Sequence, residues 1–189
     1  MDNYGLIDPE QLQEAISSET VLFSIMTANR EIGTIQPVEE MAQIAREKEI
    51  IFHTDATAAA GFISLDVKKL KVDLLSLAGD QFYGPKGSGA LFVRRGVCYL
   101  PLIEGGIQEG GRRAGTENVP AIVGLGEAAL LALETMIQRV EKLRAIRESL
   151  MEQLFGGKAG TGELIEEVEI VAAATLNDLS LDADAILSF

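Results

Sequence analysis

Short apolar runs alternate along the chain with segments of helical periodicity. The apolar runs are short enough to be buried strands, and they lie at residues 20–28, 50–55, 73–77 and 90–93. Pro37 opens a helical segment with apolar residues at the i, i+3, i+4, i+7 positions of one face, namely Val38, Met41, Ala42 and Ala45. This alternation predicts an α/β fold with a mostly parallel sheet flanked by helices, and the continuous apolar strands predict burial on both faces of the sheet.

A longer helical segment follows, which Asn118 can cap and in which Pro120 suits the first turn. Its apolar residues recur at alternating spacings of four and three, and only Arg147 interrupts the series Ala129, Leu133, Met136, Val140, Leu143, Leu150 and Leu154. The pattern predicts a helix over 119–155. A helix that connects a large and a small domain has this length, and a helix simply packed on the sheet explains the pattern equally well.

The C-terminal part of the pattern predicts a strand over 166–174 and the start of a helix over 182–189. One strand and half a helix cannot bury a core. We therefore predict a partial large domain at 1–118, a long connecting helix at 119–155 and the truncated start of a small domain at 156–189.

Composition restricts the classes of protein to which the chain can belong. It has 189 residues, 47% of them hydrophobic, which is enough for one sizeable core. No apolar run approaches about 20 residues, so no membrane-spanning helix is predicted, and the N-terminus lacks the pattern of a signal peptide. A formal net charge of −13 disfavours binding to nucleic acid, whose phosphates require clustered basic residues. We expect a cytoplasmic protein without a membrane or nucleic-acid partner.

Few side chains suggest chemistry by themselves. Asp55 follows a buried strand and can either cap the next segment or pair with a cation. His53 is the only histidine, and a lone histidine at a strand end is typically structural; zinc would need about four ligands, so no metal site is predicted. Cys98 lies in an apolar stretch and is expected to be a small buried residue.

Two glycine-rich clusters, at residues 84–89 and 105–115, flank strands and are candidate site loops, because ligands of such sheets bind beyond the carboxyl ends of the strands. Lys86 lies in the first cluster, whose spacing does not match a phosphate-binding P-loop. Thr116 follows the second cluster, where a hydroxyl at a helix start suits a phosphate or an ordinary cap.

The order of several motifs is more specific than any one of them. Residues 29–37 read NREIGTIQP, 53–56 read HTDA, 84–91 read GPKGSGAL and 115–120 read GTENVP. In this order they resemble the cysteine desulfurases, which are class V, fold-type I enzymes that use pyridoxal phosphate. The resemblance extends from about Tyr4 to the long helix and implies the central part of the large domain of that fold.

The resemblance implies roles for two retained residues. Asp55 matches the aspartate that pairs with the protonated pyridine nitrogen and makes the ring an electron sink. Thr116 matches a threonine that the partner subunit contributes to the cofactor phosphate, which implies a homodimer.

Other positions depart from the family. Where the family has Ser-x-His-Lys, residues 78–81 read AGDQ: Ala78 replaces a phosphate-binding serine, Asp80 the histidine, and Gln81 the Schiff-base lysine. A glutamine amide can neither condense with an aldehyde nor act as the base that moves a substrate proton. We expect no covalent attachment of pyridoxal phosphate and weak or absent binding.

Three further positions are degenerate. Ala58 stands where a glutamine meets the cofactor's phenolic oxygen, Arg30 where an asparagine does so, and Gly110 where the family has an arginine. The family's ring-stacking histidine is expected upstream of this sequence and its persulfide cysteine downstream, and Cys98 matches neither.

The family reaction transfers sulfur from L-cysteine, giving alanine, for iron–sulfur cluster assembly. Three hypotheses follow: a cysteine desulfurase-like protein that is catalytically impaired, a non-catalytic remnant or subunit that pairs with a complete desulfurase or an iron–sulfur assembly protein, and a chain that still binds pyridoxal phosphate without a covalent bond. A selenocysteine lyase ancestry stays open.

Overall fold

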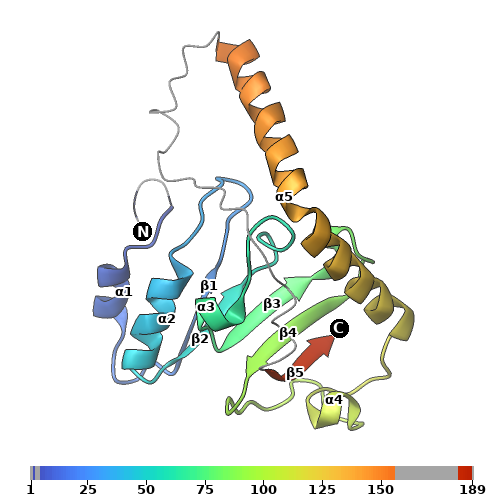
Figure 1. Ribbon diagram of the computed structural model, residues 1–189. Coiled ribbons are helices and arrows are strands. Elements are labelled where there is room, and N and C mark those ends of the chain that lie inside the picture. The colour runs from blue at the N-terminus through green and yellow to red at the C-terminus, as the bar shows by residue number, and fades with distance from the viewer. Residues whose placement is uncertain (1, 3–4, 156–182, 189) are drawn as a thin grey trace.

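The computed structural model describes residues 2, 5–155 and 183–188, and within them the strands form one sheet (Figure 1). The sheet has the order β1-β2-β3-β4-β5. Its strands are β1 (Leu22–Met26), β2 (Ile51–Asp55), β3 (Leu74–Ala78), β4 (Gly89–Arg94) and β5 (Ala183–Ser188). The neighbours β1, β2 and β3 run parallel, whereas β4 is antiparallel to both β3 and β5. The predicted α/β class is confirmed, with a mixed sheet.

Helices connect and flank the strands. They are α1 (Pro9–Ala15), α2 (Val38–Glu47), α3 (Val67–Leu70), the 3-10 helix η1 (Gly79–Phe82), α4 (Gln108–Gly111) and α5 (Val119–Phe155). Aspartates start two of the short helices that the sequence did not predict: Asp8 accepts from the backbone N–H of Glu10, and Asp66 accepts from that of Lys68.

The core lies between one face of the sheet and the helices. All four residues predicted for the apolar face of α2 are buried, and they join the core cluster that contains Phe52 and Leu75. Phe23 stacks on Phe52 with ring centroids 4.6 Å apart. These neighbours explain why the runs in β1, β2 and β3 form strands, since their alternate side chains complete one apolar layer.

The opposite face of the sheet is only partly covered within the described part of the chain. Ser24 and Asp55 are exposed, and His53 and Ser76 are half-buried, although their neighbours in sequence face the core. The predicted burial on both faces is wrong here, because β1 exposes the apolar Leu22 and Met26 on this face together with Ser24.

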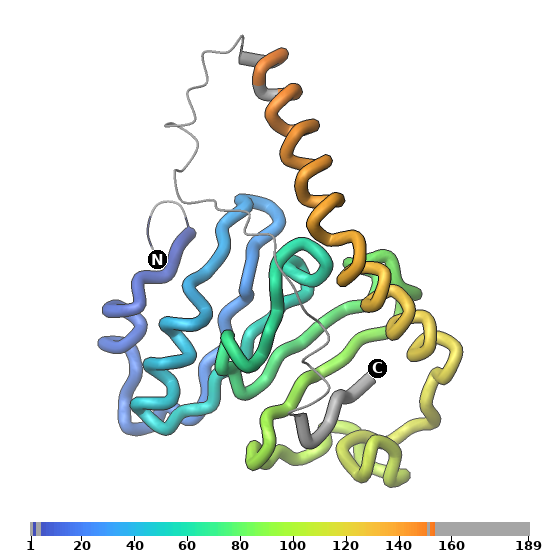
Figure 2. Tube along the Cα trace, viewed as in Figure 1, coloured from blue at the N-terminus to red at the C-terminus, as the bar shows by residue number. Residues whose placement is uncertain are grey.

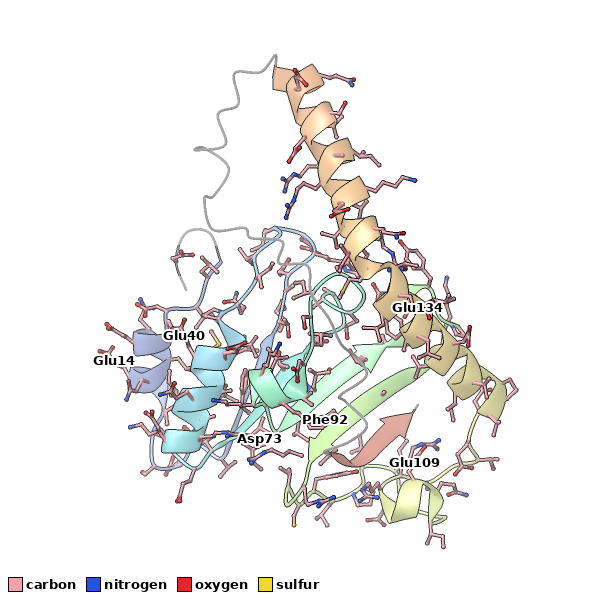
Figure 3. All side chains as sticks on the ribbon, viewed as in Figure 1. Glu14, Glu40, Asp73, Phe92, Glu109 and Glu134 are labelled. Carbon is pink, nitrogen blue, oxygen red and sulfur yellow. The ribbon has the colours of Figure 1, made fainter. Side chains whose placement is uncertain are left out.

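An ion pair between a buried carboxylate and a half-exposed guanidinium fixes β3 against β4. Asp73, labelled in Figure 3, immediately precedes β3, and its Oδ1 accepts from Arg94 Nε at 2.6 Å and from the Nη2 of the same guanidinium. Asp73 Oδ2 accepts from the backbone N–H of Phe52 at 2.8 Å. One carboxylate therefore links β2, β3 and β4.

Helix α5 has the bounds predicted for the long helix, and Asn118 Oδ1 accepts from the backbone N–H of Ala121 at 3.4 Å. Its first half packs on the domain through Leu125, Ala132 and Met136, among others. From residue 141 to residue 150 every side chain is exposed, and Figures 1 and 2 show this half extending past the sheet.

By length and composition alone, Val119–Leu150 is a helix that could cross a membrane, which the run-length argument from the sequence missed. The core helix of a soluble protein passes the same test. Of the window that passes the test, 28% is buried in the described structure, where residues such as Leu125 and Ala132 pack against the sheet domain.

The C-terminal segment differs from its prediction. Residues 183–188, expected to begin a helix, form β5, which pairs antiparallel with β4 so that Leu91 lies opposite Leu187. The unpaired edge of β4 offers backbone donors and acceptors that a helix would leave unsatisfied. The strand predicted over 166–174 lies outside the described residues, and the division into two domains stays a prediction.

Candidate functional site

Asp55 is the last residue of β2 and lies exposed at the carboxyl edge of the parallel strands. Its Oδ1 accepts from the backbone N–H of Thr57 at 2.9 Å and from Ser76 Oγ at 3.4 Å. The first contact closes an Asx turn rather than capping a helix. Both contacts use Oδ1, so Oδ2 can accept a hydrogen bond from a ligand.

His53 lies two residues before Asp55 on the same face of β2. Its Nδ1 is 2.7 Å from Ser24 Oγ on β1, and its Nε2 is 3.2 Å from Ser76 Oγ on β3. Burial lowers the pKa of His53, and the nearby Asp55 carboxylate opposes that effect by raising it. The imidazole is therefore a structural link across three strands, as the sequence indicated.

Gln81 lies in η1, directly after β3. Its Nε2 donates to Oδ2 of the neighbouring Asp80 at 2.8 Å. Ala78, the last residue of β3, contributes a methyl group where the resemblance places a hydroxyl. Position 81 therefore carries an amide that is hydrogen-bonded to the adjacent Asp80.

The glycine-rich segment after η1 is a closed loop packed on α5. The backbone N–H of Gly84 donates to Gly79 O at 2.8 Å, and Ser88 Oγ donates to Pro85 O at 2.6 Å. A Cβ on Gly84 would lie 2.8 Å from Gly79 O and 3.2 Å from the Cβ of Ala128 on α5. The loop therefore has a packing role, and Lys86 is exposed on it.

The remaining residues predicted for the site are not hydrogen-bonded to this edge of the sheet. Thr116 and Arg30 are exposed, Ala58 is half-buried, and Gly110 has a φ of 66° in α4. Among the described residues, no hydrogen bond joins Thr116, Arg30 or Ala58 to Asp55 or Gln81.

Cys98 is exposed, which corrects the expectation of a buried residue. The segment that contains it leaves the sheet after β4, and further along the same segment Leu100 and Leu102 are also exposed. An apolar composition therefore does not mark a strand here.

The residues at this edge fit only part of pyridoxal phosphate. The Asp55 carboxylate suits the protonated nitrogen of a pyridine ring. Gln81 cannot form a Schiff base, and Ala78 cannot donate to a phosphate. The residues present do not fit a covalently held cofactor. Among the described residues, no group of three His, Cys, Asp or Glu side chains could hold a metal ion.

Sequence reasoning missed Ser24 and Ser76. The signal that identifies them is the strand register, which sets Ser24 opposite His53 and Ser76 opposite Asp55. That register is not visible in any one segment of sequence.

Comparisons with known proteins agree with the motif order. The family model described as aminotransferase class-V matches residues 1–161. The cysteine desulfurase IscS of Methanosarcina thermophila is 54% identical over 154 residues, which are 82% of this chain and 38% of that protein. The IscS of Dictyoglomus turgidum is 47% identical over 154 residues, covering 82% of this chain and 39% of its own length.

Solved structures show the same similarity. A NifS-like protein superposes with a TM-score of 0.78 at 41% identity, covering 81% of this chain and 42% of that one. The NifS-like protein from Rickettsia africae gives a TM-score of 0.78 at 32% identity, over 84% of this chain and 45% of that one. The chain spans about two fifths of the length of these relatives. With a family model matched over most of its residues, the chain belongs to the aminotransferase class-V family, and its relatives there are cysteine desulfurases.

Proposed function

We propose that this chain is a cysteine desulfurase-like polypeptide in which the family reaction is impaired. That reaction takes sulfur from L-cysteine and leaves alanine, with pyridoxal phosphate as the cofactor. The family assignment supports the reaction class. The impairment is supported by one observation above the others, the amide of Gln81 at the Schiff-base position, bonded to Asp80.

The residues around Gln81 support the same proposal. Proton transfer needs a group that gains and loses a proton near neutral pH, and a glutamine amide does not. Lys86 is exposed on the loop that packs against α5. Within the described part of the chain, no hydrogen bond or ion pair joins Lys86 to Asp55. It is a poor replacement for the missing amine.

We further infer a homodimer, because such an assembly would explain an exposed Thr116 that matches a threonine contributed to the other subunit's site. Exposed apolar side chains before α4, including Leu102 and Ile107, support a protein surface there. The alternative of a non-catalytic subunit that pairs with a complete desulfurase predicts a mixed complex. Light scattering of the chain alone, and after mixing with such a relative, separates the two assemblies.

An alanine assay tests the proposed impairment. The purified chain is incubated with pyridoxal phosphate and L-cysteine, beside the IscS of Methanosarcina thermophila as a positive control. We expect alanine from the control and none above the protein-free rate from this chain. Turnover by the chain at a rate within about tenfold of the control, which is about 1.4 kcal/mol in barrier height, would overturn the impairment.

A further inference from the structure

A chain of polar side chains crosses three strands on the partly open face of the sheet. It begins at Ser24 on β1, passes through His53 on β2 and Ser76 on β3, and ends at Asp55. The successive contacts measure 2.7 Å, 3.2 Å and 3.4 Å. The parallel register places Ser24 opposite His53 and Ser76 opposite Asp55, and the contact between His53 and Ser76 runs diagonally between these pairs.

The chemistry of these groups allows only one donor-to-acceptor direction along the series of hydrogen bonds. An ionised Asp55 carboxylate only accepts, so the Ser76 hydroxyl donates to its Oδ1. That hydroxyl carries a single hydrogen, so Ser76 must accept from His53 Nε2, which then carries the ring proton. In a neutral imidazole the other nitrogen is an acceptor, and the Ser24 hydroxyl donates to Nδ1.

This direction requires a neutral ring, and the surroundings favour one. Burial lowers the pKa of His53, whereas the Asp55 carboxylate raises it by a smaller amount. The groups that approach the imidazole from the neighbouring strands are the hydroxyls of Ser24 and Ser76, which carry no charge. A protonated ring would make Nδ1 a donor and would force Ser24 to reverse.

The last hydrogen bond of the series fixes the Asp55 carboxylate. Two donors, the Ser76 hydroxyl and the Thr57 backbone N–H, converge on Oδ1. Hydrogen bonds to the charged form of a carboxyl group favour ionisation. They also restrict rotation of the group, which leaves Oδ2 in a fixed place for a ligand.

We propose that Ser24, His53 and Ser76 are positioning residues that hold the Asp55 carboxylate in one orientation, so that Oδ2 accepts the N–H of a heteroaromatic cation. The class of ligand rests on the proposed function, because a protonated pyridine ring is such a cation. The hydrogen-bond chain does not rest on it, and it can be tested on the protein without a ligand.

The single histidine makes the test clean, because every imidazole signal comes from His53. Nitrogen-15 NMR of the ligand-free full chain at pH 7 should show a neutral ring protonated at Nε2. Asp55→Asn removes the carboxylate that raises the pKa of His53 and should lower that pKa further. Asp80→Asn is the matched control, since Asp80 bonds Gln81 and is not among the causes of the His53 shift, and it should leave the titration unchanged.

A second measurement concerns Asp55, at the other end of the hydrogen-bond series. Carbon-13 NMR of labelled aspartates identifies the Asp55 carboxyl signal as the one that Asp55→Asn removes. Ser76→Ala deletes a donor to Oδ1 and should shift that carboxyl signal at pH 7, whereas Ser76→Thr keeps a hydroxyl and should restore its position. Circular dichroism confirms that each variant is folded.

A ring protonated at Nδ1, or an Asp55 carboxyl signal that Ser76→Ala does not move, would overturn the proposal. Neither result involves pyridoxal phosphate or turnover. The alanine assay therefore fails or succeeds independently of this chain of hydrogen bonds.

Discussion

Asp73 illustrates how single residues hold the fold on which the site depends. Its carboxylate is almost fully buried and joins the backbone of β2 to the guanidinium of Arg94 at the end of β4. A buried carboxylate that loses its cation is left with part of its desolvation cost uncompensated. The pair therefore fixes the strands whose ends carry Asp55 and Ala78.

We expect Arg94→Met to lower the free energy of unfolding by about 2–3 kcal/mol, because Asp73 then keeps only its backbone donor. Urea denaturation measures this change. The control is Arg147→Met, whose partner Glu148 lies 3.9 Å away in an exposed pair and whose loss should cost less than about 0.5 kcal/mol. Equal effects of the two substitutions would show that the buried pair contributes nothing special.

At the scale of elements, local periodicity predicted the features that depend on neighbouring residues in the sequence. The face of α2 and the start of α5 followed from apolar spacing and capping residues, and both are present. Pairing between distant segments was not predictable in this way. Residues 183–188 suit a helix or a strand by composition, and only the free edge of β4 decides for a strand.

The site shows the same limit. Asp55 could be singled out because it ends an apolar run, and Gln81 because the motif around it is specific. The serines on either side of His53 could not, because they are ordinary polar residues until the register brings them to the ring.

The contact between α5 and the glycine-rich loop offers a test within one helix. A Cβ on Gly124 would lie 2.5 Å from Cγ of Pro85, whereas a Cβ on Gly126 would meet nothing within 4 Å. We expect Gly126→Ala to stabilise the protein by about 0.5–1 kcal/mol through helix propensity.

The companion substitution Gly124→Ala should instead destabilise the protein by about 1–3 kcal/mol, because it overpacks the Pro85 contact. Thermal unfolding of both variants measures the difference. If both substitutions raise the melting temperature equally, α5 does not pack against the loop as described.

At the scale of the whole molecule, the described part of the chain has the mixed α/β fold of its family and a packed glycine-rich loop. We propose that its Asp55 carboxylate matches that of the family, whereas the Gln81 amide stands in place of the amine needed for a covalent cofactor. Its first half of α5 is packed and its second half is exposed. On this account, the fold does not depend on the residue that would attach the cofactor. The central claim is that this chain retains the desulfurase fold without a position for covalent attachment of pyridoxal phosphate.

Reductive trapping tests that claim most directly. The chain and Gln81→Lys are each incubated with one equivalent of pyridoxal phosphate, reduced with borohydride, and digested for mass spectrometry. We predict no specific modification of the unsubstituted chain and a modification at position 81 in the variant, where an amine replaces the amide. Stoichiometric modification of one lysine in the unsubstituted chain, such as Lys86, would contradict the account.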